Sequence, residues 1–300
     1  MENNTRFNSI NSYLRKVFGR KTVKLSIDGG FTCPNRDGTL GTGGCAFCSP
    51  DGSGEMASDI DGQIELLSKK WPDAAYIGYF QSHTNTYEPV EDLRRKYYSV
   101  LQDPRISGIA IATRPDCLSD EVVDLLSEIN QKHFMWVELG LQTSNPETMK
   151  KMNLGYTTED FRRSVKELNR RNIKVVTHLI LGLPGESEED MFNSVKFLTS
   201  GENGHIFGLK LHLLNVVKGS TLAATMPDYT PFSSIEEYCD LVVMILEIIP
   251  PDITIHRLTG DAPRSLLITP EWSYRKRTIL NTINKMMNER DVKQGDKILK

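Results

Sequence analysis

The sequence has no long apolar run and little net charge, and each absence narrows the choice of function. No stretch approaches the roughly 18–20 consecutive apolar residues that cross a bilayer. Residues 1–16 contain no apolar core of a secretory signal. We therefore expect no membrane association and a cytoplasmic location. The net charge is −3 over 300 residues, which by itself argues against a generic nucleic-acid-binding protein.

The charge that is present lies unevenly along the chain. Residues 1–24 hold six Lys and Arg against one Glu, and residues 274–300 hold eight against three acidic residues, so each end carries +5. The middle of the chain therefore carries −13. Two basic ends that lie close together would form a phosphate-binding surface, whereas two separate ends would be ordinary solvated segments. The sequence leaves both interpretations open.

Cysteine is scarce, and the five cysteines make an odd number. Three of them, Cys33, Cys45 and Cys48, fall within 16 residues. Because cytosolic chains rarely use structural disulfides, this cluster favours metal binding or redox chemistry. Cys239 lies among apolar residues of a predicted helix and is expected to be a small core residue. Cys117 is either another core residue or a thiol that faces the substrate.

Short apolar runs alternate with amphipathic helical runs through the middle of the chain. Several apolar runs are nearly continuous, as strands are in a parallel sheet that helices cover. The alternation predicts repeated βαβ units. Six strands are expected, at residues 23–27, 75–81, 108–114, 134–142, 173–183 and 206–217. Such strands either close partly into a barrel or lie in an open doubly wound sheet, and periodicity does not distinguish the two.

The pattern changes after residue 219. A helix is expected at 235–249, a short strand-like segment at 254–260, and a final helix from about 271 to 288. We therefore divide the chain into a basic N-terminal segment (1–22), a strand–helix core (23–220) and a C-terminal extension packed on that core (221–300).

The clustered cysteines have the spacing C-x11-C-x2-C and follow directly after the first predicted strand. In a parallel α/β fold, loops that follow strands lie at the face where active sites form. Three thiolates leave one iron of a cubane cluster without a protein ligand, which is the open position that a cofactor or substrate needs. A structural zinc site is the alternative, and it would need a fourth ligand such as His83 or Cys117.

The cysteine loop resembles that of radical S-adenosylmethionine (SAM) enzymes, in which an aromatic residue precedes the last of three cysteines. Its long first gap is similar to that of the elongator catalytic subunit and of the YhcC/YtqA family. The segment Glu138-Leu-Gly-Leu-Gln142 resembles the family's E-x-G-x-Q segment. The segment His178-Leu-Ile-Leu-Gly182-Leu-Pro-Gly resembles its G-L-P-G segment.

This resemblance implies a fold, cofactors and a set of site residues. The fold would be a partial (β/α)6 TIM-like barrel with a C-terminal helical extension, and Cys33, Cys45 and Cys48 would bind a [4Fe–4S] cluster. An electron donor such as flavodoxin or ferredoxin would drive cleavage of S-adenosyl-L-methionine to a 5′-deoxyadenosyl radical, which abstracts hydrogen from the substrate. The implied cofactor-binding residues are Phe47, Gln81, Glu138, Gln142, His178 and Gly182.

Three of these residues also have an ordinary structural interpretation. Glu138 could be an exposed carboxylate in a loop, His178 a core histidine, and the segment around Gly182 a common strand-to-helix turn. The sequence also departs from the family pattern at two positions. Leu154 stands where related enzymes carry an Arg for the SAM carboxylate, and Ala112 stands where some carry an acidic residue.

The segments that begin at Asp28, Phe80 and His256 resemble the YhcC/YtqA (MnmL-like) family. The YtqA branch of this family is implicated in converting a carboxymethylaminomethyl group on the wobble uridine of tRNA to an aminomethyl group. The resemblance therefore implies tRNA as the partner. The two basic ends agree with this, because tRNA binding depends on contacts between Lys or Arg and phosphate.

Three charged residues are candidates for catalysis on the substrate side: Lys210, Arg257 and Asp261. Lys210 falls in an apolar strand, and buried lysines are rare without a partner. Arg257 and Asp261 lie where a loop after the barrel could cover the substrate, or else hold the extension in place through a structural ion pair. Two other functions remain open, a radical SAM enzyme for a small metabolite or protein, and a zinc-stabilised nucleic-acid-binding protein.

Overall fold

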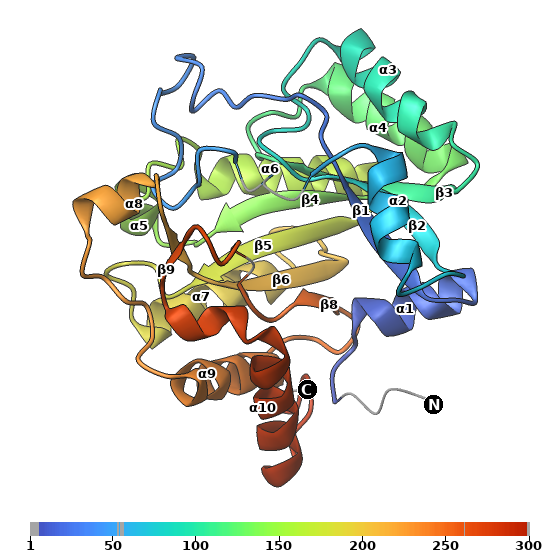
Figure 1. Cartoon of the computed structure of the whole chain (residues 1–300). Coiled ribbons are helices and arrows are strands. Elements are labelled where there is room, and N and C mark those ends of the chain that lie inside the picture. Colours follow the sequence, from blue (N-terminus) through green and yellow to red (C-terminus); the bar gives the residue numbers. More distant parts are fainter. Residues whose placement is uncertain (1–5, 53, 55–56, 261, 299–300) are drawn as a thin grey trace.

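The computed structural model describes residues 6–52, 54, 57–260 and 262–298. In these residues seven parallel strands form one curved sheet with the spatial order β1-β2-β3-β4-β5-β6-β8 (Figure 1). The strands are β1 (Thr22–Ile27), β2 (Ala75–Phe80), β3 (Ile106–Thr113), β4 (Phe134–Gln142), β5 (Val175–Leu181), β6 (Gly208–Leu213) and β8 (Thr254–Arg257). The sheet is a half-barrel, so the predicted α/β partial TIM-like barrel is confirmed.

Helices follow most of the strands and cover the outer face of the half-barrel (Figure 1). The helices of the described residues, including those that lie elsewhere, are α1 (Ile10–Phe18), α2 (Ile60–Ser68), α3 (Val90–Leu101), α4 (Asp120–Lys132), α5 (Pro146–Lys151), α6 (Thr158–Arg170), α7 (Glu188–Thr199), α8 (Thr221–Thr225), α9 (Ile235–Glu247), the short 3-10 helix η1 (Glu271–Tyr274) and α10 (Lys276–Glu289). No helix in the described part of the chain combines the length and the apolar character that crossing a membrane requires.

Helix α6 illustrates how local sequence specifies these elements. The Thr157 hydroxyl accepts a hydrogen bond from the Asp160 N–H at 3.2 Å, and the Asp160 carboxylate accepts one from the Thr157 N–H at 2.9 Å. This capping box fixes the first turn of the helix. Phe161, Val165 and Leu168 follow at helical spacing and are buried, so the cap aims one apolar stripe at the sheet.

The sheet has one strand more than the sequence pattern indicates. Residues 254–260 were expected to lie outside the barrel, but Thr254–Arg257 pairs in parallel with β6 and forms its seventh strand. Four residues are too few for a periodic pattern, so only the pairing shows that this segment belongs to the sheet. The expected strand 206–217 is divided, because β6 ends at Leu213 and β7 (Val216–Val217) pairs antiparallel with β9 (Leu267–Thr269).

The basic N-terminal segment contains a helix, α1, that the sequence analysis did not predict. The side chain of Ser9 caps its first turn, and Gly19, at φ +69°, ends it. Leu14 of α1 is buried in one cluster with Ile77 and Trp136 from the inner face of the sheet. Helix α1 therefore covers the end of the half-barrel at which the strands begin (Figure 1).

The two ends of the described chain lie side by side. Arg6 forms an ion pair with Asp291 at 2.8 Å and donates to the side chain of Asn288 at 2.8 Å. The backbone N–H of Asn8 donates to the side chain of Gln294 at 2.9 Å. The contact lies near α1, away from the cysteine loop (Figure 1).

Candidate active site

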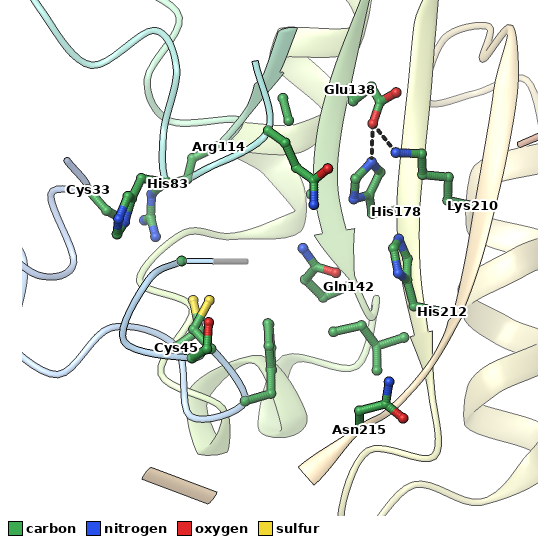
Figure 2. Close-up of a pocket in the computed structure, with 18 of the residues that line it drawn as sticks. Cys33, Cys45, His83, Arg114, Glu138, Gln142, His178, Lys210, His212 and Asn215 are labelled. Atoms are coloured by element: carbon green, nitrogen blue, oxygen red, sulfur yellow. Dashed lines mark hydrogen bonds and ion pairs between the residues drawn. The ribbon is translucent and has the colours of Figure 1, made fainter. Parts of the chain in front are cut away.

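A cavity of about 250 Å³ lies between the carboxyl ends of the strands and the cysteine loop (Figure 2). Strands β2 to β6 and β8 all contribute side chains to its lining. The lining includes these sequence-predicted residues: Cys33, Cys45, Phe47, Cys48, Gln81, Glu138, Gln142, His178, Lys210 and Arg257. Residues separated by more than 200 positions in the sequence are thus brought to one site.

The three clustered cysteines face this cavity from one side. The backbone N–H of Cys48 donates to the carbonyl of Cys45 at 2.9 Å, which forms a tight turn between these two ligand candidates. The buried Asn35 donates to the sulfur of Cys45 at 3.7 Å. Burial, together with the nearby Cys48 and Cys33, raises the pKa of the Cys45 thiol to about 12. Three thiols gathered in a buried site bind as thiolates only when a metal supplies compensating positive charge.

Backbone hydrogen bonds hold the cysteine loop against the rest of the site. Ala46 donates to the carbonyl of Met152 at 2.9 Å, and Leu222 donates to the carbonyl of Ala46 at 2.7 Å. The side chain of Asn153 donates to the carbonyl of Gly44 at 2.8 Å. The loop is therefore fixed on both sides by segments near α5 and α8, and its thiols are positioned in advance.

The arrangement of these cysteines fits a cluster with three protein ligands. In a cubane each thiolate binds a different iron, so the sulfurs surround the cluster and do not meet at one point. The donor set of Cys33, Cys45 and Cys48 along one cavity wall thus suits a [4Fe–4S] cluster.

Glu138 is the centre of a hydrogen-bond network deep in the half-barrel. Its side chain is fully buried, so it is not the exposed loop carboxylate that the sequence allowed as an alternative. Its carboxylate accepts hydrogen bonds from Tyr79 Oη at 2.6 Å, from Trp136 Nε1 at 2.9 Å and from His178 Nε2 at 2.9 Å. Strands β2, β4 and β5 thus meet at this network, and β1 and β6 join it through the two lysines described next.

Two lysines supply the positive charge around Glu138. Lys210 is 1% exposed, and its Nζ donates to the Glu138 carboxylate and, at 2.9 Å, to Tyr79 Oη. Lys24 Nζ lies 3.4 Å from the other carboxylate oxygen. Burial alone would raise the pKa of Glu138, but the charges of Lys210 and Lys24 hold it well below its usual value. We call Lys24, Tyr79, Glu138, His178 and Lys210 the barrel floor.

His178 joins the barrel floor to the open part of the cavity. Because an ionised carboxylate only accepts hydrogen bonds, Nε2 of His178 must carry the proton that Glu138 receives. Burial and the neighbouring Lys210 lower the pKa of His178 to about 4, against the opposing effect of Glu138. The imidazole is therefore neutral near pH 7, and its ring lies 4.9 Å from that of His212.

Of the remaining predicted site residues, Gln142 lies at the cavity, whereas Gly182 does not belong to its described lining. Gln142 has a positive φ of +67° and lines the cavity. Gly182, at φ +84°, does not belong to the described lining; a Cβ there would lie 2.7 Å from side chains of Pro231 and Phe232. Gly182 therefore lets the following segment pack against the chain after α8. Asp261 lies outside the described residues.

At the two positions that depart from the family pattern, the structure shows small or apolar side chains beside a buried arginine. Ala112 lines the cavity, and Leu154 is fully buried. Arg114 also lines the cavity; its guanidinium forms two hydrogen bonds to the Asp116 carboxylate, at 2.9 and 2.8 Å, and a third to the carbonyl of Leu154 at 2.8 Å. A permanent positive charge therefore lies near the cysteine loop even though position 154 is apolar.

Several residues of the site were missed by the sequence analysis. Lys24 alternates with apolar neighbours in β1, and this alternation could have indicated that it faces inward. Asn215 interrupts an apolar run just after β6, which was the available signal for a functional role. Tyr79 gave no signal, because a tyrosine in a strand is common in any core.

Family models match most of the chain. The model of the radical SAM superfamily matches residues 37–198, and that of the radical SAM C-terminal domain matches residues 206–289. The chain is 42% identical to YtqA of Bacillus subtilis over 299 residues, which cover 97% of this chain and 92% of YtqA. It is 34% identical to YhcC of Escherichia coli over 288 residues, which cover 93% and 91% of the two chains.

The half-barrel with its three-cysteine loop is thus that of a radical SAM enzyme, and the chain belongs to the radical SAM superfamily. Within that superfamily it falls in the family of YtqA and YhcC. Its fold is similar to that of an Elp3 from the archaeon Methanocaldococcus infernus, with a TM-score of 0.65, 19% identity, and coverage of 78% of this chain and 58% of that one. Membership implies a [4Fe–4S] cluster, SAM and a reductant.

Proposed function

We propose that this radical SAM enzyme modifies tRNA, converting a carboxymethylaminomethyl group on the wobble uridine to an aminomethyl group. The observation that carries the radical SAM part is the cavity that Cys33, Cys45 and Cys48 share with the barrel floor. The resemblance to the YtqA branch supports the choice of tRNA, and so does the surface beside the cavity. Flavodoxin or ferredoxin would supply the electron.

When bound, the cluster and SAM supply the one-electron chemistry that removes a hydrogen atom from the substrate. The chain's own residues hold and shield this chemistry. Cys33, Cys45 and Cys48 would bind three irons, and Phe47, Gln81 and Gln142 lie along the same lining, where they can contact SAM. The barrel floor excludes water from beneath the reacting groups, because its polar atoms already pair with one another.

Positive and aromatic side chains from the C-terminal part of the chain lie together next to a residue that lines the cavity. The guanidinium groups of Arg264 and Arg275 lie over the Tyr274 ring, 4.6 and 5.7 Å from its centroid, and all three side chains are exposed. Arg264 directly follows Pro263, which lines the cavity. We call Arg264, Tyr274 and Arg275 the basic rim. Exposed arginines next to an aromatic ring suit RNA, whose phosphates pair with guanidinium and whose bases stack.

The basic N-terminal segment has a different position. Its helix α1 covers the opposite end of the half-barrel, and the two chain ends meet there through Arg6 and Asp291. The two basic ends are therefore neighbours, but their contact does not lie at the cavity. The basic rim is the part that can hold an RNA whose modified base enters the site.

Comparison of tRNA nucleosides tests the proposal directly. A strain without this gene should accumulate carboxymethylaminomethyl-type uridine and lose the aminomethyl form, as measured by liquid chromatography and mass spectrometry. The wild-type gene should restore the aminomethyl form, and a Cys45→Ala variant should not. An unchanged nucleoside profile in the deletion strain would exclude tRNA wobble uridine as the substrate and leave a small metabolite or a protein to be tested.

A further inference from the structure

The charged side chains that line the cavity are mostly positive. Its described lining contains one carboxylate and four cationic side chains, namely Arg36, Arg114, Lys210 and Arg257. The carboxylate, Glu138, already accepts hydrogen bonds from Trp136 and from residues of the barrel floor. A cavity with this balance of charge favours a ligand with a negatively charged group.

Two of the four cationic residues lie on the side of the cysteine loop. Arg36 is part of that loop and donates to the carbonyl of Ser49 at 2.6 Å. Arg114 pairs with Asp116 and donates to the carbonyl of Leu154, the position at which related enzymes carry an arginine for the SAM carboxylate. We therefore expect the carboxylate of SAM on this side of the cavity.

The other two cationic residues are neighbours in the sheet. Lys210 of β6 lies opposite Arg257 of β8 in the parallel pairing, and His178 of β5 lies opposite Lys210. Arg257 is the last residue of β8, so it stands at the carboxyl end of its strand. In Figure 2 His178 and Lys210 lie across the cavity from Cys45. Arg257 thus lines the cavity beside Lys210, on the side away from the cysteine loop.

The charge of Arg257 acts on the middle of the site. Burial lowers the pKa of His178 and that of His212, and the positive charges of Lys210 and Arg257 lower both further. Lys210 donates to Glu138, and an ammonium group is a point charge. A guanidinium has five N–H donors in one plane, so Arg257 can bind both oxygens of a carboxylate and still keep a contact with the protein.

We propose that Arg257 binds a carboxylate of the substrate on the side of the cavity opposite the cysteine loop. The identity of this carboxylate rests on the proposed function, because the carboxymethylaminomethyl group ends in a carboxylate that the aminomethyl product lacks. The product ends instead in a positively charged ammonium group, which Arg257 and Lys210 repel. Arg257 thus holds the substrate by the part that is removed, and its charge favours release of the product.

Equilibrium binding of three RNA probes to the reconstituted enzyme tests the proposal. Each probe is an anticodon stem-loop whose wobble uridine carries a carboxymethylaminomethyl group, the neutral amide of that group, or an aminomethyl group. The probes are titrated against the wild type and Arg257→Gln. Arg94→Gln, which changes an ion pair with Glu128 on the outside of the barrel, is the matched control.

The wild type should bind the carboxylate probe roughly 10–100-fold more tightly than the amide probe, as expected for hydrogen bonds between charged groups. The aminomethyl probe should bind no better than the amide probe. Arg257→Gln should bind the carboxylate and the amide with nearly equal affinity, whereas Arg94→Gln should keep the preference of the wild type.

Absence of the preference in the wild type, or the same preference in Arg257→Gln, would overturn the proposal. A purely structural role of Arg257 gives the second result, because it weakens all three probes equally. If Arg257→Gln does not fold, as judged by its denaturation midpoint, Arg257→Lys replaces it. Lysine keeps the charge but loses the paired contact, so the preference should be smaller than in the wild type.

The outcome is separate from that of the proposed function. Altered wobble uridine in the deletion strain, with no carboxylate preference, would keep the tRNA substrate and remove the role of Arg257. Unchanged tRNA would remove that substrate, and the probes are then N-methylglycine and its amide, with protection of Arg257 from phenylglyoxal measured by peptide mass spectrometry. Protection by the carboxylate alone would keep the site, and any other result would overturn it.

Discussion

The guanidinium of Arg114 donates through Nη1 to the carbonyl oxygen of Leu154 at 2.8 Å. Leu154 is the position at which the sequence departs from the arginine of related enzymes. Arg114, which directly follows β3, thus contacts the backbone of Leu154. Arg114 is 7% exposed and its guanidinium also binds Asp116, so it links the segment after β3 to the segment after α5.

Replacing Arg114 by lysine should weaken this linkage. Lysine keeps the charge but loses the paired contacts to Asp116 and the planar geometry. We expect the free energy of unfolding to fall by roughly 1–3 kcal/mol, because buried acceptors lose their donors. Urea unfolding of the cluster-free protein measures this. Arg94→Lys, in an ion pair with Glu128 on the outside of the barrel, is the control and should change stability by less than about 1 kcal/mol.

Removing one cluster thiol should abolish the iron–sulfur spectrum. After anaerobic reconstitution, the wild type should show a broad absorption near roughly 400 nm that Cys45→Ala lacks. Cys239→Ala, which changes a buried cysteine in α9, is the control and should retain the absorption. Metal analysis that finds one zinc and no iron in anaerobically purified protein would contradict the cluster assignment.

Loss of the charge on Glu138 should strongly destabilise the barrel floor. In Glu138→Gln the buried Lys210 loses its anionic partner, and breaking such a pair typically costs about 3–5 kcal/mol. The double variant Glu138→Gln with Lys210→Met should recover part of this loss, because no unpaired buried charge remains on Lys210. Urea unfolding of the single and double variants measures the coupling. Additive losses would mean that the two side chains do not act as a pair.

His178 should make stability depend on pH in a defined range. Its pKa is lowered from 6.5 to about 4, so between these values the unfolded chain binds a proton that the folded chain does not. The His178 contribution to the free energy of unfolding, about 3 kcal/mol at most, should therefore be lost as the pH decreases from 6.5 towards 4 and be constant above this range. His178→Gln should reduce this slope in urea titrations of the cluster-free protein. The exposed His205→Gln is the control; a slope that His178→Gln leaves unchanged would refute the assignment.

The basic rim should determine the salt dependence of RNA binding. If Arg264 and Arg275 each contact one phosphate, each change to alanine should reduce the slope of log K against log salt by about 0.7–0.9. Filter binding of an anticodon stem-loop at several salt concentrations measures the slope. Arg15→Ala, in the basic helix α1, is the matched control. A reduced slope in Arg15→Ala alone would show that RNA binds at the other end of the barrel.

The sequence was sufficient for the features that repeat or cluster locally. Cys33, Cys45 and Cys48 stand close together in the chain, and alternating strands and helices predict the barrel in which they lie. Glu138 and His178 were recognisable because each begins a segment that resembles the family's, whereas the hydrogen bond between them across β4 and β5 was not predictable. Distances between strands depend on register, which single-sequence patterns do not contain.

The missed features depend on long-range packing. Strand β8 is too short to show a period, and it exists because β6 offers an edge for pairing. The side chain of Asn215 packs against Gly260, which lies 45 positions further along the chain. Because the loop that contains Gly260 determines the surroundings of the Asn215 amide, the sequence around Asn215 has no pattern that reveals them. Such positions are found only when the loops that enclose them are known.

Helix α1 has a consequence for the order of events during turnover. Because Leu14 packs among inward-facing residues at the start of the strands, α1 covers that end of the described half-barrel. We therefore expect cofactor and substrate to reach the cavity from the side of the cysteine loop. Cofactor and substrate would then use the same entrance to the cavity. A macromolecule bound at the basic rim would block the exchange of SAM cleavage products for new SAM. It would then have to dissociate in each catalytic cycle. We therefore expect ordered binding kinetics, in which SAM binds first and the large substrate second.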